Sequence, residues 1–448
     1  MRHLFLPIVL LTVSLGLLSA RPVRAQSPTG YVSLFGDYFP NRQDTTELRA
    51  RVFVEEKIEP SARLVFTLSG FAEGLLSQRV VPGSGQGLQS VTDGIVRVQD
   101  GNIVILGQRV DLLAGYARIA WGKLDEIQPT DVINPLDVSR YFFEGRSEAR
   151  LPVLLARARI HLSESISLDG VYLPDFRRGR FDQLDEPTSP FNLPVTVAED
   201  PVVCLAIGCP TAPVPVSDRA PAFKAGNAQG GARVSATSGR VDWSVSVFRG
   251  FESFGLYTFE GAPRSPVPPP TVAVVYPRFT MVGGDFEAVR GRWGLRGEAA
   301  AFVDDNFQSA DLRVVGGQSF DAGVGVDRRA GDYTLSATVL VHSESYDTPL
   351  SVPNSSPNLS DAVSDGRTDV SLVVSADRTF ARERYRFRGF GVYNAAAASG
   401  FIRGIGIANL RDNLGLEASI GWFAGDGRDL VGRFGDSDFA YLRLKYYF

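Results

Sequence analysis

Segments in which apolar and polar side chains alternate recur along the whole chain. In residues 384–394, RYRFRGFGVYN, Arg384, Arg386 and Arg388 alternate with Tyr385 and Phe387. Successive side chains of a β-strand point to opposite faces, so this alternation predicts strands with one polar and one apolar face. The same pattern occurs in residues 47–57, 151–162, 240–248, 369–377 and 414–422. It fits a soluble sheet, and equally a membrane barrel whose arginines line an aqueous lumen.

The amino-terminal 25 residues have a different character. A basic start is followed by the apolar run Leu4–Leu18 and by Val23-Arg24-Ala25, a small-x-small sequence typical of a cleavage site. This pattern predicts a secretory signal peptide over residues 1–25. Beyond Gln26 we find no apolar run of the roughly 18 residues that a membrane-spanning helix requires. Residues 26–448 are therefore expected to be exported, and any membrane span in them is expected to be a β-strand.

The last nine residues, AYLRLKYYF, alternate and end on Phe448. A terminal aromatic residue on an alternating last strand resembles the signal by which Gram-negative outer-membrane barrels are recognised for insertion. The resemblance implies an outer-membrane location. It also implies contact with outer-membrane lipid and lipopolysaccharide, and with the barrel-assembly machinery through this last strand.

Short and long connections alternate between the expected strands. Short ones occur at Glu59-Pro60, Ser238-Gly239, Gly291 and Ala330-Gly331, and long ones at 122–149, 174–228, 251–272, 304–317 and 346–366. Outer-membrane barrels have short periplasmic turns and long extracellular loops. We therefore predict an all-β fold, a transmembrane antiparallel β-barrel of about 18 strands, with 16 as the alternative. Either number leaves an aqueous lumen. We find no segment that supplies a two-faced buried core, so we expect an aqueous lumen rather than a filled interior.

Composition excludes several functions. The chain has 46 basic and 50 acidic residues, and a nucleic-acid-binding domain would be basic. Of its three histidines two follow the signal peptide, and His161 and His342 are expected near opposite ends of the barrel, so we expect no catalytic site. We also expect no metal site and no cofactor. Cys204 and Cys209, in an exported loop, are expected to form a disulfide.

The segment from Ala117 to Val153 carries a more specific pattern. Trp121-Gly122 is followed by an acidic stretch, then by Asn134-Pro135-Leu136-Asp137, then by Leu151-Pro152. This order resembles a family of uncharacterised, porin-like Gram-negative outer-membrane barrels, known as a domain of unknown function. The resemblance covers roughly residues 94–190, including LPDFRRGRFDQLDEPTSPFN. It implies a porin-like barrel, and some relatives are thought to accompany export systems. It implies no particular substrate.

Two structures are open to the loop after Trp121. It can fold into the lumen and narrow it, or it can cap the extracellular mouth with rigid turns. In the first case its acids would face arginines of the wall, because opposed charges across a constriction select solutes. The candidate constriction residues are Asp125, Glu126, Asp131, Asp137, Arg157, Arg159, Arg384, Arg386 and Arg388.

We therefore expect a porin-like channel for passive passage of small hydrophilic or amphipathic solutes. The alternative is a non-conducting receptor, adhesin or structural partner of an envelope export complex.

Overall fold

The computed structural model describes most of the chain after the predicted signal peptide. The described residues are 24–25, 27–42, 45–80, 88–180, 216–260, 271–309, 312–352, 362–425, 429 and 431–448. Cys204 and Cys209, and with them the expected disulfide, lie outside these residues.

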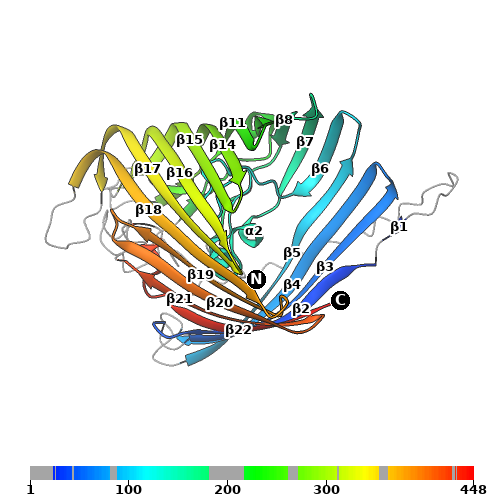
Figure 1. Ribbon diagram of the computed structural model, residues 1–448. Helices are drawn as coiled ribbons and strands as arrows, with labels where there is room; N and C mark the ends of the chain where they lie inside the picture. The colour runs from blue at the N-terminus through cyan, green and yellow to red at the C-terminus, as the bar shows by residue number, and fades with distance from the viewer. Residues whose placement is uncertain are drawn as a thin grey trace.

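Eighteen antiparallel strands form one closed barrel (Figure 1). The barrel strands are β2 (Thr29–Phe39), β3 (Thr45–Ser61), β4 (Leu64–Val80), β5 (Leu88–Ile105), β6 (Val110–Ala117), β7 (Val153–His161), β8 (Ile166–Leu173), β10 (Gln229–Ser238), β11 (Val241–Phe251), β14 (Arg278–Arg290), β15 (Trp293–Gln308), β16 (Val314–Ala330), β17 (Tyr333–Val352), β18 (Ala362–Phe380), β19 (Tyr385–Asn394), β20 (Ser399–Arg411), β21 (Leu414–Ala424) and β22 (Phe439–Tyr447). Pairing of β2 with β22, from Tyr31 opposite Tyr447 to Tyr38 opposite Ala440, closes the ring. The predicted fold class and the count of about 18 are confirmed, and the alternative of 16 is wrong.

Short turns occupy one end of the barrel, and all the long connections lie at the other. Two-residue turns join β10 to β11, β14 to β15 and β16 to β17, and each has a glycine with positive φ, at Gly239, Gly291 and Gly331. Glycine enters this backbone region without steric cost, which explains these three predicted turns. The first turn lies after Ser61, so Glu59 and Pro60 belong to β3. We call these the short-turn end and the long-loop end.

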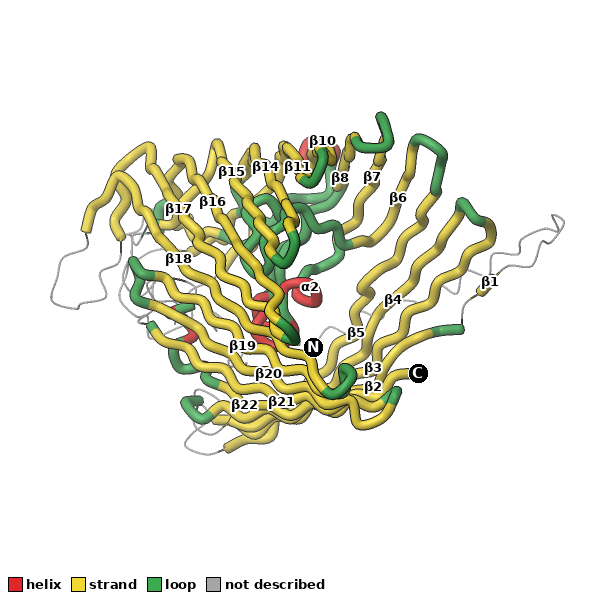
Figure 2. The backbone as a smooth tube through the Cα atoms, in the orientation of Figure 1, coloured by secondary structure: helices red, strands yellow, loops and turns green. Residues whose placement is uncertain are grey.

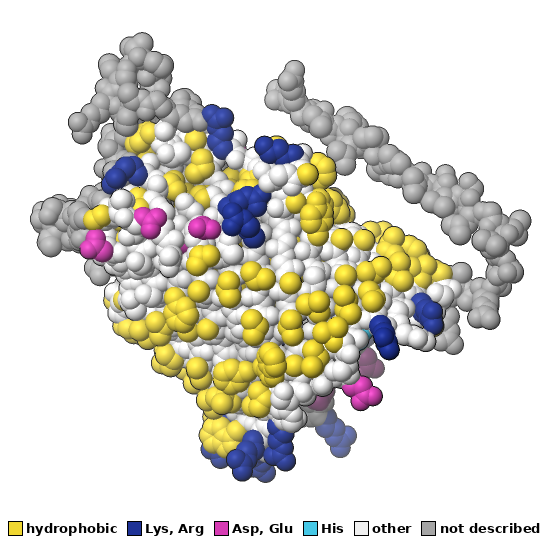
Figure 3. Space-filling view, turned by 90° about the horizontal axis from the view of Figure 1, so that it is seen from above, with side chains coloured by type: hydrophobic (Ala, Val, Ile, Leu, Met, Phe, Trp, Pro, Cys, Tyr) yellow, Lys and Arg dark blue, Asp and Glu magenta, His cyan; other side chains and the backbone are white. Residues whose placement is uncertain are grey.

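The outer wall of the barrel is apolar. Exposed side chains such as Val96, Leu372, Phe387 and Trp422 project from it. One outer face is mostly hydrophobic across its middle, with charged side chains toward its margins (Figure 3). A band of this kind is what a lipid-facing wall requires, since it puts no charge into hydrocarbon.

Several minor elements accompany the barrel. A two-residue strand, β1 (Arg24–Ala25), pairs with β3, and both its residues belong to the predicted signal peptide. Strands β9 (Val216–Asp218), β12 (Leu256–Glu260) and β13 (Thr271–Val275) form a separate small sheet. The helices of the described residues are α1 (Val138–Glu144), α2 (Arg146–Ala149) and the 3-10 turns η2 (Ala225–Asn227) and η3 (Gly432–Phe434). None of them is long and apolar enough to cross a membrane.

The expectation of a core-free interior is wrong. Near the long-loop end several strands are apolar on both faces. In β20, for example, Phe401 is buried on the inner face and Ile402 is exposed on the outer face. Likewise β21 carries buried Phe423 inside and exposed Trp422 outside. The inward aromatic residues are covered by the connection between β6 and β7, which folds into the barrel (Figures 1 and 2).

Candidate functional site: the inward segment and the lumen wall

Residues 118–152, between β6 and β7, form an inward segment that crosses the lumen and includes α1 and α2. Figure 2 shows this connection and its short helices inside the ring of strands. Its side chains contact the inner faces of strands on several sides of the barrel, as the following contacts show. Of the two structures expected for this loop, the structure therefore has the one that folds inward.

Glu298 of β15 holds the beginning of the inward segment. Its Oε1 accepts hydrogen bonds from the backbone N of Thr130 at 2.7 Å and from Thr130 Oγ1 at 2.8 Å. Its Oε2 accepts bonds from the backbone N of Lys123 at 2.9 Å and of Leu124 at 3.2 Å. One buried carboxylate thus accepts hydrogen bonds from three backbone N–H groups of the segment.

Gly122 makes this approach to Glu298 possible. Its φ is +97°, a region that residues with a side chain rarely adopt, and a Cβ there would lie 2.6 Å from Glu298 Oε1. The Trp-Gly pair therefore has two structural roles. Trp121 is 1 % exposed and packs on Phe248 of β11, with ring centroids 6.4 Å apart.

Acidic and amide residues of the segment form hydrogen bonds that stabilise its own conformation. Asn134 joins the two ends of the segment, since its Oδ1 accepts the N–H of Ile119 at 2.7 Å and its Nδ2 donates to the carbonyl of Leu151 at 2.8 Å. Asp131 Oδ2 accepts from Nε of Arg146 at 3.0 Å and of Arg150 at 2.8 Å. These contacts give the Asn-Pro-Leu-Asp region a structural explanation.

Aromatic side chains of α1 fasten the middle of the segment to the opposite wall. Phe142 and Phe143 are buried against inward residues of β2 and β19–β22 and against η3: Phe35, Phe39, Phe390, Phe401, Phe423, Phe434, Phe439 and Tyr441. On the other side Ile119, Trp121 and Ile133 pack against β7, β8, β11, β14 and β15. Burial of a large aromatic side chain contributes several kcal/mol, roughly 3–5 by its loss to alanine. The segment is therefore fixed to both sides of the barrel.

Ion pairs with the wall of β3–β5 add to this attachment. Glu144 binds Arg51, Arg140 Nη2 binds Glu73 at 3.0 Å, and Arg97 Nη1 binds Asp137 at 2.9 Å. Burial alone would raise the pKa of Glu144, but Arg51 and Arg140 outweigh it and hold that pKa well below its usual range. Glu144 is thus ionised at every ordinary pH, and removing one partner of such a buried pair is costly.

The tip of the segment meets the remaining wall through two acids. Asp125 binds Arg296 of β15, and Glu126 binds Arg388 of β19 at 2.5 Å. Burial raises the pKa of Glu126, and Arg388 offsets part of that shift. The tip therefore carries a carboxylate that takes up a proton more readily than an exposed one.

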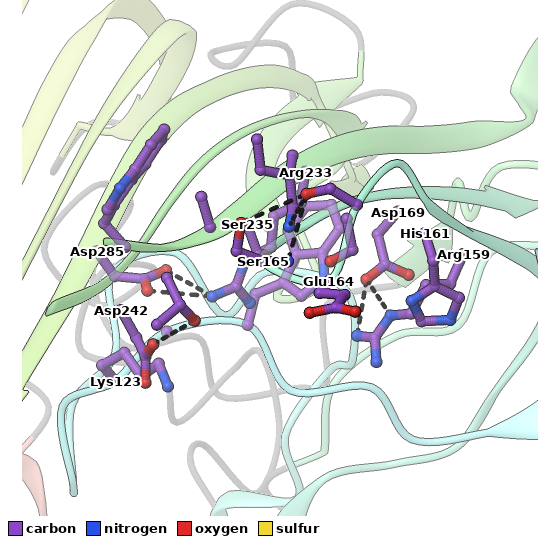
Figure 4. Close-up of a pocket in the computed structure, with 18 of the residues that line it drawn as sticks. Lys123, Arg159, His161, Glu164, Ser165, Asp169, Arg233, Ser235, Asp242 and Asp285 are labelled. Carbon is purple, nitrogen blue, oxygen red and sulfur yellow. Dashed lines mark hydrogen bonds and ion pairs between the residues drawn. The ribbon is translucent and has the colours of Figure 1, made fainter. Parts of the chain in front are cut away.

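On the short-turn side of the segment lies a polar cavity of about 440 Å³. Residues 120–123 of the inward segment cover it, and inward residues of β7, β8, β10, β11 and β14 line it (Figure 4). Arg233 Nη2 binds Asp285 Oδ2 at 2.8 Å, and Arg159 Nη2 binds Asp169 Oδ2 at 2.8 Å. The cavity is accordingly lined by charges of both signs, several of which form ion pairs with one another.

The structure brings together only one pair of the expected constriction residues across the lumen, Glu126 with Arg388. Arg157 and Arg159 do not face the acids of the loop, because Asp169 on the adjacent strand lies nearer and binds both. Asp131 is used within the segment, and Asp125 and Asp137 bind Arg296 and Arg97, which the sequence had not singled out.

The arginine row of β19 is shorter than the sequence suggests. Arg384 lies in the turn before β19, where it is exposed over the ring of Tyr385. Arg386 pairs with Asp377 of β18 at 2.9 Å, and Arg388 reaches the inward segment. Phe387 is 53 % exposed on the outer face. The structure therefore places two arginines of this row inside the barrel.

The histidines lie on different parts of the wall. His161 ends β7 and its Nε2 lies 2.9 Å from Asp111 Oδ2. His342 lies in the middle of β17 rather than near its end, with Nδ1 2.6 Å from Asp321 and Nε2 2.8 Å from Glu344. No group of His, Cys, Asp and Glu in the described part of the chain is arranged to hold a metal ion.

Sequence comparison assigns the chain to a family. The family described as "Protein of unknown function (DUF1302)" matches residues 99–377, more than half of the chain. The chain belongs to this family. No curated protein matches the sequence.

Three solved structures give the fold comparison. Pseudomonas aeruginosa OccK7 (OpdD) matches with a TM-score of 0.50 and 11 % identity, over 94 % of this chain and 97 % of its own. P. aeruginosa OccK2 (OpdF) in complex with glucuronate has a TM-score of 0.48 and 12 % identity, over 95 % and 97 %. Acinetobacter baumannii OccAB3 has a TM-score of 0.47 and 10 % identity, over 94 % and 99 %. The similarity to OccK7 supports the barrel fold of this DUF1302 protein, and at 11 % identity it supports the fold alone.

Proposed function

We propose that this DUF1302 protein is a porin-like channel of the outer membrane that passes small hydrophilic or amphipathic solutes passively. The observation that carries the proposal is the inward segment, which is fixed on several sides and narrows a barrel wide enough to hold water. An 18-strand barrel without such a segment would leave a broad lumen. A fixed segment therefore sets the size and charge of what passes.

We expect solutes to pass along the polar side of the lumen. The segment uses its aromatic residues against β2 and β19–β22, and its other apolar residues against β7, β8, β11, β14 and β15. Its tip, Asp125 and Glu126, meets arginines, and the cavity below it is lined by charged groups. Opposed charges across a narrow, low-dielectric passage focus the field and discriminate between solutes.

The outer-membrane location rests on the apolar outer wall and on the alternating last strand, β22. Lipid and lipopolysaccharide would cover this wall. The barrel-assembly machinery would recognise β22, where Leu442, Leu444 and Tyr446 are exposed on the outer face. A charged residue on such a face costs about 2–4 kcal/mol at the bilayer midplane.

Liposome swelling tests the proposal. Proteoliposomes that contain the refolded full chain are diluted into isotonic sugars that increase from a pentose to a tetrasaccharide. We expect swelling rates that fall steeply with solute size, and rates at the level of protein-free liposomes for the largest sugar. Equal, background-level rates for every sugar would overturn the channel, and the non-conducting receptor, adhesin or export-complex partner would replace it.

A further inference from the structure

Three arginines gather around Asp137 at the point where the inward segment meets β5, and a fourth, Arg177, interacts electrostatically with Arg97, Arg180 and Asp137. We call Arg97, Arg140, Arg177 and Arg180 the arginine cluster. Asp137 Oδ2 lies 2.9 Å from Arg97 Nη1, 3.5 Å from Arg140 Nε and 4.0 Å from Arg180 Nε. The strand-like pairing of Asp137 with Arg180 brings the FRRGR sequence, residues 176–180, alongside the Asn-Pro-Leu-Asp sequence.

The cluster has more positive than negative charge. Ion pairs run from Arg140 through Glu73 and Glu144 to Arg51. Even without Arg180, the four guanidinium groups of Arg51, Arg97, Arg140 and Arg177 accompany the three carboxylates of Glu73, Asp137 and Glu144, which leaves an excess of one positive charge among these residues. Burial, together with the charges of Arg97 and Arg180, lowers the pKa of Arg177 to about 10. An additional negative charge would therefore be stabilised here.

Two buried side-chain atoms on the inner face of β5 make no hydrogen bond to any described residue. The side chain of Arg97 is 7 % exposed, and its Nη2 makes no hydrogen bond. Gln99, two positions along the inner face of β5, is 5 % exposed, and its Oε1 also makes none. A buried donor or acceptor without a partner costs about 1–3 kcal/mol, so such atoms point to a ligand that completes them.

We infer that the arginine cluster, together with Gln99, binds an oxyanion, either a carboxylate or a phosphate group, inside the barrel. Guanidinium groups match the planar geometry of carboxylate and phosphate oxygens and bind them strongly. Arg97 Nη2 donates to one oxygen of the ligand. Arg177 is half-buried, and because its Nη1 donates to the carbonyl of Pro152, it donates to the ligand from its remaining N–H groups. Gln99 Oε1 accepts from a hydroxyl of the ligand, as in monohydrogen phosphate or a hydroxy acid.

The inference deepens the proposed function and rests on it for its biological meaning, because it names the chemical class of the solute. The binding itself requires no conduction. A binding assay therefore separates failure of this site from failure of the channel.

Isothermal titration calorimetry on the detergent-purified full chain at low salt tests the site, with sodium phosphate and sodium acetate as probes. We expect saturable one-to-one binding of at least one probe, and weakening with added sodium chloride because salt screens the charges. Phosphate binding without acetate binding would assign phosphorylated solutes, and acetate binding would assign carboxylates. Absence of saturable heat with both probes would overturn the inference.

Two variants locate the binding. Arg97→Gln and Arg177→Gln should each weaken it by about tenfold or more, since each removes a charged hydrogen bond. Arg177→Gln keeps the test decisive if Arg97→Gln fails to fold, because Arg177 is not paired with Asp137. The matched control is Arg328→Gln, an exposed arginine over the ring of Trp293, and it should bind as the wild type does. Wild-type affinity in Arg177→Gln would contradict the assignment.

Discussion

Replacement of Glu298 by alanine should release the beginning of the inward segment while the barrel stays closed. The change removes four hydrogen bonds to one buried carboxylate, from the backbone N–H groups of Lys123, Leu124 and Thr130 and from Thr130 Oγ1. The strand ladder of β15 with β14 and β16 uses backbone groups alone and is not affected.

The magnitude follows from these contacts. A hydrogen bond to a charged group contributes about 1.5–3 kcal/mol, and the four bonds are not additive because lumen water reaches groups that are released. We expect a net loss of roughly 3–6 kcal/mol in the free energy of docking the segment. Since about 1.4 kcal/mol is tenfold in an equilibrium constant, the undocked population should rise by roughly two to four orders of magnitude.

Native-state hydrogen exchange, followed by mass spectrometry of the protein in detergent micelles, measures this population. Exchange in residues 118–137 should accelerate by that factor in Glu298→Ala, and by less in Glu298→Gln, which keeps one acceptor oxygen. Glu287→Ala is the matched control, because Glu287 also binds Lys123 but is partly exposed, and such pairs contribute about 0–1 kcal/mol. Unchanged exchange in Glu298→Ala, or equal acceleration in the segment and in β16–β17, would refute the reasoning.

Four further predictions concern charge, orientation and covalent structure. Burial raises the pKa of Glu126, so its charge should be lost at a higher pH than that of an exposed glutamate, and the reversal potential should then move toward anions. Glu126→Gln should show the anion-shifted reversal potential already at pH 7. The same pH profile in the wild type and in this variant would contradict the prediction. Phe387→Arg should lower barrel stability by about 2–4 kcal/mol, the cost of an arginine on the lipid face near the midplane, as measured by urea unfolding in lipid; no loss would contradict the placement of Phe387 on this face at this depth. An impermeant maleimide should label Lys224→Cys in a Cys204/Cys209-free background on intact cells, because we expect the connection from 174 to 228 to lie outside; labelling only after permeabilisation would reverse the orientation. Cys204 and Cys209 should resist alkylation until the protein is reduced, and free thiols in the exported protein would contradict the disulfide.

Local alternation predicted the strands because the two faces of a strand meet different environments along its whole length. In β3, Arg49 and Arg51 point inward and are buried, whereas Leu48 and Val52 project outward and are exposed. The turn glycines could also be predicted locally, because a two-residue turn requires a backbone conformation with positive φ at one position. Neither inference needs knowledge of distant residues.

Partner choice inside the barrel could not be predicted from local pattern. Arg403 donates a hydrogen bond to the carbonyl of Phe143, 260 residues away in the sequence. Glu298 accepts one from the backbone N–H of Thr130, 168 residues away. Arg157 and Arg159 were assigned to the loop acids because the pattern shows the sign of a side chain and not its neighbours. Asp169, on the adjacent strand, was the nearer partner.

The aromatic contacts of the inward segment correspond to a sequence pattern that the prediction of an aqueous lumen did not take into account. Phe35 and Phe39, Phe401, and Phe423 each stand at inward positions of strands whose outward positions are also apolar. A lumen wall in contact with water alone would not carry such residues on three strands. Inward aromatic residues near the long-loop end therefore indicate that a segment of the chain folds back to cover them.

Single-channel recording in planar bilayers tests the central claim most directly, that a fixed inward segment narrows a conducting lumen. The purified wild-type chain should give small, uniform conductance steps, and Glu298→Ala should give larger and noisier ones because its segment undocks. Absence of ion-conducting steps in both proteins, with the barrel folded and inserted, would contradict the account.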